Sequence, residues 1–144
     1  IKAETVNARQ QKNQAMARAQ LDLKRRQGRI QQELKDKIFE EADALIDEFM
    51  KTEAYDDFLI KCIRKAVNFA GNDELTIYIN PTDEKKRSDL EDATRVHLTI
   101  STEDFRGGVR AVIRSRNILI DNSFSTQLKE QYDKFVFLGG DGIA

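Results

Sequence analysis

The stretch LKRRQGRIQQELKDKIFEEADALIDEF, residues 23–49, decides the fold of the N-terminal third of the chain. It contains no proline and one glycine, and its polar residues separate apolar ones at helical spacing. The apolar positions that recur every eleven residues are Leu23, Leu34 and Leu45, and also Ile38 and Phe49. Eleven residues over three turns is about 3.67 per turn, and a seam of that period winds right-handed around a partner. The stretch therefore predicts a long helix that pairs with a second helix.

The same spacing runs back from Ile30 to Ala19 and Ala8, in front of this stretch. A helix of about 50 residues spans about 75 Å. A polar helix of that length gains little stability alone, because helices in proteins are stabilised mostly by packing. The alternative is a solvated helix that pairs with nothing. The residues we expect to face a partner helix are Leu23, Ile30, Leu34, Ile38, Leu45 and Phe49.

Charge is distributed unevenly along the 144 residues, although the net charge is only −1. Residues 1–37 carry a net charge of +6, residues 38–70 a net charge of −4 and residues 71–144 a net charge of −3. A basic arm on an acidic body suits nucleic acid, an acidic membrane surface or an acidic protein partner.

Cys62 is the only cysteine, so an internal disulfide is excluded, which fits a reducing compartment. No apolar run approaches the roughly 20 residues of a membrane span, and no signal peptide is evident. Because the sequence starts at Ile1 rather than Met, we expect more of the arm in front of it.

The remaining sequence predicts a small α+β head with a mostly antiparallel four-stranded sheet and helices on one face. The expected helices are Tyr55–Ala70, Thr82–Ala93 and a last helix with an apolar stripe at Phe124, Leu128, Tyr132 and Phe135. The expected strands are Leu75–Ile79, Val96–Ile100, Val109–Ile113 and Ile118–Ile120. We expect two domains, a helical coiled-coil arm over residues 1–54 and the head over residues 55–144.

Residues that could carry catalysis or bind a metal are few and scattered. His97 is the only histidine, and in a strand it points away from the side of its apolar neighbours. Cys62 lies beside an apolar position of a helix and is expected to be a small buried hydrophobe rather than a catalytic thiol. Gly107-Gly108 precedes a strand rather than a helix, so a turn or bulge is expected instead of a phosphate loop. The sequence therefore predicts no catalytic residues, no cofactor and no metal.

Two groups of basic residues could bind a partner. Arg106, Arg110, Arg114 and Arg116 cluster around the glycine turn and the hairpin. Arginines there could bind phosphate or an acidic partner, or simply face solvent. Lys24-Arg25-Arg26 with Arg29 is the densest basic run, but no aromatic residues are interleaved for base stacking.

The segment from Phe105 to Leu128 resembles the E subunit of the vacuolar/archaeal-type rotary ATPases. The shared pattern is the glycine pair Gly107-Gly108, a short strand, a charged hairpin, a strand ending near Asn122, and a helix carrying Leu128. The long charged N-terminal helix in front of a small α+β head also matches.

The resemblance implies a non-catalytic peripheral-stalk, or stator, subunit on the cytoplasmic side of a membrane. Such a subunit forms a heterodimer with a helical subunit, usually called G, in a right-handed coiled coil. It binds the catalytic-head subunits at its C-terminal end, for which Arg110, Arg114 and Arg116 are candidates here, and membrane-associated subunits through its N-terminal arm. It holds the catalytic head against rotor torque, which couples ATP hydrolysis or synthesis to ion transport.

Two other hypotheses remain open on the sequence. A stator-like regulator of a flagellar or type III export ATPase also pairs a long helix with an α+β tail. A nucleic-acid-binding protein would use the basic arm, and its affinity for DNA would depend steeply on salt.

Overall fold

The structure, a computed structural model, describes residues 2–137, with side chains from residue 5 onward. The chain divides into two units. The helical unit comprises the described parts of residues 1–40 and 135–144, and the αβ unit is Glu41–Lys134. The expected domain boundary between residues 54 and 55 stays a prediction.

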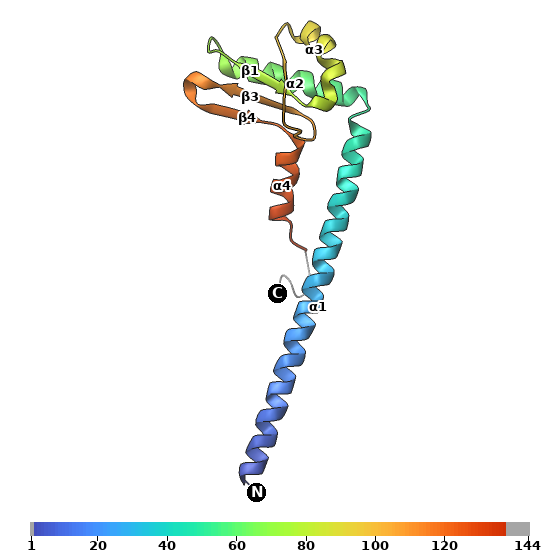
Figure 1. Cartoon of the computed structure of the whole chain (residues 1–144), viewed down its shortest axis with the longest axis vertical. Coiled ribbons are helices and arrows are strands. Elements are labelled where there is room, and N and C mark those ends of the chain that lie inside the picture. Colours follow the sequence, from blue (N-terminus) through green and yellow to red (C-terminus); the bar gives the residue numbers. More distant parts are fainter. Residues whose placement is uncertain (1, 138–144) are drawn as a thin grey trace. The chain divides into compact units, whose positions relative to one another are not determined.

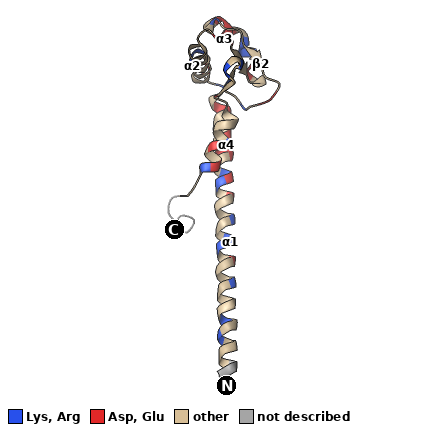
Figure 2. Cartoon of the chain, turned by 90° about the vertical axis from the view of Figure 1, so that its left-hand side faces the viewer, with Lys and Arg blue, Asp and Glu red and all other residues tan. Residues whose placement is uncertain are grey.

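Helix α1 (Lys2–Phe49) is continuous through the stretch with which the sequence analysis began (Figure 1). Most of its described side chains are exposed, as expected for a helix rich in charged residues. Its basic residues are spaced along the N-terminal part and its acidic residues are concentrated near its end (Figure 2). The prediction of one long N-terminal helix is confirmed.

Helix α2 (Glu53–Ala70) supplies much of the core of the αβ unit. It ends at Gly71, whose φ of +60° is readily adopted by glycine and rarely by other residues. Its buried side chains are Tyr55, Leu59, Cys62, Ile63, Ala66 and Ala70. Val67 is half-buried and packs against this core.

The sheet contains β1 (Thr76–Ile79), β2 (Thr99–Ile100), β3 (Val109–Ile113) and β4 (Ile118–Asp121) in the order β2-β1-β3-β4. β1 pairs with β3 and β3 with β4 in antiparallel fashion, with Ile77 opposite Ala111 and Ala111 opposite Ile120. β1 and β2 are parallel. Buried side chains alternate along β3, and Figure 1 shows α2 beside the sheet. The predicted mostly antiparallel four-stranded sheet is confirmed.

The connection between β1 and β2 differs in detail from the expectation. The expected helix over residues 82–93 consists of a 3-10 helix, η1 (Pro81–Lys86), followed by α3 (Arg87–Thr94). The expected strand over residues 96–100 is only two residues long. Its amide at Leu98 donates to Glu91 Oε2 at 2.8 Å, so this donor is not available to a sheet ladder.

The hairpin between β3 and β4 turns through η2 (Arg114–Arg116) and Asn117, which has a left-handed φ of +52°. Asparagine tolerates that conformation better than most residues. Helix α4 (Phe124–Lys134) follows β4, and the Ser123 hydroxyl accepts from the Thr126 amide at its start. Phe124 is buried, while Phe135 lies beyond the end of α4.

Candidate partner-binding surfaces

Five of the six residues expected to face a partner helix are exposed on α1. We call Leu23, Ile30, Leu34, Ile38 and Leu45 the apolar row. The exposed fractions in the helical unit run from 42% for Ile38 to 56% for Leu23 and Ile30, and Leu45 in the αβ unit is 69% exposed. Large apolar side chains that are exposed along one face of a helix, rather than scattered singly, indicate an interaction surface.

Phe49, the sixth expected residue, packs within its own chain. Its ring centroid lies 5.7 Å from that of Tyr55 and 6.4 Å from that of Phe124. It is half-buried against the core of the αβ unit. Phe49 therefore anchors the last turn of α1 to this core, and its contact with a partner helix stays a prediction.

Arg110, the first of the three candidate arginines, is held by its own unit. Its Nη1 lies 3.2 Å from Glu103 Oε2, and its Nε lies 3.4 Å from Asp121 Oδ2 without hydrogen-bond geometry. Its guanidinium lies 4.8 Å from the centroid of the Phe105 ring, and its side chain is only 20% exposed. The Arg110 guanidinium is therefore already engaged within its unit and poorly accessible to a partner.

Arg116, like Arg110, is held by contacts within its own unit, whereas Arg114 is not. The Arg116 Nε is 2.8 Å from Asp73 Oδ2, its Nη2 donates to the Phe69 carbonyl, and its guanidinium lies over the exposed Phe69 ring. Arg116 thus ties the hairpin to the end of α2. Arg114 is exposed and makes no ion pair or hydrogen bond among the described residues, which leaves it the candidate most available for docking.

Sequence reasoning placed Arg106 near the glycine turn but missed its contacts with α1. Its Nε donates to Asp43 Oδ1 at 2.7 Å, and its Nη2 contacts the Asp43 carbonyl at 2.8 Å and Asp47 Oδ1 at 2.7 Å. These hydrogen bonds with the two carboxylates raise the pKa of Arg106 above its ordinary value. The sequence feature that could have predicted these contacts is the spacing of Asp43 and Asp47, which are four residues apart and so share one helix face.

A buried polar network lies under the glycine pair. The Tyr55 hydroxyl donates to Asp83 Oδ2 and accepts from the Gly108 amide at 3.1 Å. Burial raises the pKa of both Tyr55 and Asp83 above their ordinary values. Asn80 adds a second buried link, since its Oδ1 accepts from the Phe105 amide at 2.8 Å. The network joins α2, η1 and the loop before β3, and it is enclosed rather than open to a substrate.

The residues considered for catalysis do not converge. The His97 side chain is 75% exposed, and its Nδ1 lies 3.1 Å from Glu91 Oε2. Cys62 is buried, and burial raises the pKa of its thiol. Among residues 2–137, no group of three or more potential ligands stands close enough to hold a metal ion.

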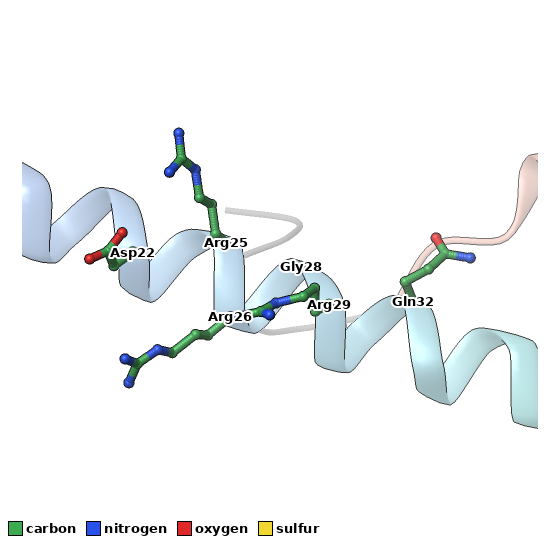
Figure 3. A pocket seen from close by; sticks show the side chains of 6 residues that line it. All are labelled: Asp22, Arg25, Arg26, Gly28, Arg29 and Gln32. Atoms are coloured by element: carbon green, nitrogen blue, oxygen red, sulfur yellow. The ribbon is translucent and has the colours of Figure 1, made fainter.

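The side chains of the basic run on α1 do not converge on one point. Asp22, Arg25, Arg26, Arg29 and Gln32 surround an open depression on the helix surface (Figure 3). In that view Arg25 and Arg26 point to different sides of the helix rather than toward a common ligand. Within the described part of the chain, no helix is long and apolar enough to cross a membrane.

Comparison with known proteins identifies the family. The family model described as "ATP synthase (E/31 kDa) subunit" matches residues 2–136. The E subunit of a V-type proton ATPase from Halothermothrix orenii is 25% identical over 130 residues, which cover 85% of this chain and 64% of that relative. Because the family model matches nearly the whole chain, the chain belongs to the E-subunit family of the V-type ATPases.

Proposed function

We propose that this chain is a non-catalytic peripheral-stalk subunit, or stator, of a V/A-type rotary ATPase. The observation that carries the proposal is the exposed apolar row on α1, in a member of the E-subunit family. Leaving this row in water is unfavourable by about 25 cal/mol for each Å² of apolar surface. A second helix with a matching row removes that cost and stiffens α1.

In this role α1 pairs with a helical subunit of the G type. The αβ unit docks on the catalytic-head subunits, and the N-terminal part of α1 meets subunits associated with the membrane sector. The complex lies on the cytoplasmic face of a membrane. The stalk resists rotor torque, so that ATP hydrolysis or synthesis stays coupled to ion transport.

The proposed role is mechanical and requires no cofactor. It makes no catalytic demand on exposed His97, on buried Cys62 or on the buried Tyr55–Asp83 pair. A general base must lie within hydrogen-bond reach of the proton it removes from a substrate, and enclosed Asp83 offers no such approach.

The test is co-expression of this chain with the G-type subunit of the same ATPase, followed by size-exclusion chromatography and circular dichroism. We expect a 1:1 heterodimer whose helical signal exceeds the sum of the separate chains, because packing stabilises the arm. A chain that remains single in the presence of that subunit would contradict the proposal. Tight, strongly salt-dependent retardation of duplex DNA in a gel would instead support the nucleic-acid hypothesis.

A further inference from the structure

One side of the apolar row carries a charged residue three positions after each of its leucines. Arg26 follows Leu23, Lys37 follows Leu34, and Glu48 follows Leu45. Residues three apart on a helix are neighbours on its surface, so these charges lie beside the row along continuous α1. In paired helices, the positions beside the apolar seam are where charges select a partner.

These side chains are available to a partner. Arg26 and Lys37 are exposed and make no ion pair or hydrogen bond with the described residues. Glu48 contacts Lys51 at 3.3 Å, but both side chains are 73% exposed. An exposed pair of this kind contributes little stability, so Glu48 can leave Lys51 and pair with a cationic side chain of the partner helix.

The other side of the row is neutral. The residues three positions before each leucine are Gln20, Gln31 and Ala42. In the helical unit, Gln31 is half-buried and shares a shallow groove with Phe135–Phe137. The Phe135 ring lies 5.7 Å from Phe39 and 5.1 Å from Phe137. The chain thus covers part of the neutral side itself and leaves the charged side open.

We infer that the helix paired with α1 carries acidic side chains opposite Arg26 and Lys37 and a basic side chain opposite Glu48. This rests on the proposed function and adds the chemistry of the partner to it. A second copy in parallel register gives no such match, because one side of a seam faces the other side of the partner's seam, which sets Arg26 and Lys37 opposite neutral Gln31 and Ala42. A partner with the reversed order of charges meets attraction at all three positions.

The test uses the full chain and two labelled synthetic helical peptides of about 30 residues. Both carry leucines at eleven-residue spacing and have the same net charge at their other positions. At the three positions that follow each leucine by eight residues, which face Arg26, Lys37 and Glu48 across a parallel pair, one has Glu, Glu and Lys and the other has Lys, Lys and Glu. Fluorescence anisotropy measures both affinities in about 0.1 M and about 1 M salt, where the screening length is about 10 Å and about 3 Å.

We expect the Glu-Glu-Lys peptide to bind about fivefold to tenfold more tightly in about 0.1 M salt, and the difference to shrink in about 1 M salt. The triple variant Arg26→Glu, Lys37→Glu, Glu48→Lys should reverse the preference. The matched control is Arg18→Glu, Arg29→Glu, Glu40→Lys, which makes the same charge changes five positions before each leucine, away from the row. The control should leave the preference intact.

Each other result has a distinct meaning. Equal binding of the two peptides overturns the inferred partner charges and leaves the pairing through the apolar row standing. Failure of both peptides to bind counts against that pairing, and so against the proposed function. Self-association of the chain that is tighter than binding to either peptide overturns the inference in favour of a second copy.

Discussion

Gly107 and Gly108 bring the loop after Phe105 against the core and the start of α4. Their φ angles are +138° and +84°, which residues with a Cβ rarely adopt. A Cβ on Gly108 would stand 2.2 Å from the Asn122 carbonyl oxygen, which is backbone and cannot turn aside. The glycine pair that marked the family resemblance therefore has a steric reason.

We expect Gly108→Ala to lower the free energy of unfolding by about 3 kcal/mol or more, because it adds a backbone clash to a strained φ. Gly71→Ala is the matched control. Gly71 has a φ of +60° and a ψ of −117° but open space around its Cβ position, so its replacement should cost only the backbone strain, about 1 to 2 kcal/mol. Urea denaturation of both variants measures the difference, and equal losses would contradict the role of the close approach.

Asp121 links β4 to the start of α4 through charge-dependent hydrogen bonds. Its Oδ1 accepts from the Ser123 amide at 2.8 Å, and its Oδ2 accepts from the Thr126 hydroxyl at 2.8 Å. Burial alone raises its pKa, but these bonds and the charge of Arg110 lower it below the ordinary value. A carboxylate of this kind stabilises the fold in its ionised form.

We therefore expect Asp121→Asn to lower the free energy of unfolding by about 1 to 2 kcal/mol at neutral pH. Because the folded-state pKa is depressed, the wild-type advantage is present above the unfolded pKa of about 4 and is lost as pH falls through the lower folded-state value. Urea titrations at a series of pH values measure it. A difference that stayed constant down to the acid limit would show that ionisation does not contribute.

At the scale of elements, the end of α1 is joined to the loop before β3 by Arg106, which contacts both Asp43 and Asp47. Phe49 adds an apolar contact with Tyr55 and Phe124. Both contacts lie within the αβ unit. They explain why the last turns of α1, from Glu41 onward, belong to this unit.

A double-mutant cycle on Arg106→Ala and Asp43→Asn should give a coupling energy of about 1 kcal/mol, since the pair is hydrogen-bonded but half-exposed. Arg114→Ala is the control, because Arg114 is exposed and makes no ion pair with the described residues. Its effect on the free energy of unfolding should stay within about 0.5 kcal/mol. Additive effects of the two changes at Arg106 and Asp43 would mean that their contact contributes nothing.

The elements were predictable wherever a local pattern determines them. The alternation of apolar residues predicted both ends of β3 correctly. The helical period, followed by Gly71, predicted the end of α2 correctly. The strand before residue 100 was predicted too long, because the Leu98 amide bonds the Glu91 side chain instead of a neighbouring strand. The Arg106 contacts escaped prediction because they join residues 63 apart in sequence.

Across the whole chain, the six residues predicted at a partner helix divide into the exposed apolar row and the half-buried Phe49. Their helical spacing could be read from sequence, but the contacts of Phe49 with the core depend on tertiary packing. The three arginines divide similarly, since only Arg114 lacks an ion partner among the described residues.

Leu34→Asp should weaken pairing of α1 with its helical partner at least about tenfold, because burying a leucine contributes about 1.5–3 kcal/mol. Leu119→Asp on β4 is the control, since Leu119 is similarly exposed at 59%, compared with 48% for Leu34. Sedimentation equilibrium of each variant with the G-type subunit measures the affinity. An unchanged affinity for Leu34→Asp would remove the centre of the row from the interface.

Arg114→Glu should weaken binding of the chain to the catalytic-head subunits by about threefold to tenfold at low salt, because charges at the rim of an interface act mainly on association. The control Asp73→Asn removes the ion-pair partner of Arg116 and leaves both arginines charged. It should not reproduce the loss. Surface plasmon resonance with the catalytic-head subunits compares the variants, and an unchanged association rate for Arg114→Glu would exclude this residue from docking.

The burial of Cys62 has a practical consequence, because this is the sole thiol of the chain and only 6% of the residue is exposed. An alkylating reagent can reach it only when α2 separates from the core around it. The rate of alkylation of unlabelled protein therefore reports how often the αβ unit opens. If the alkylation rate is measured in the assembled ATPase during ATP hydrolysis, a faster rate would show that mechanical load opens the αβ unit.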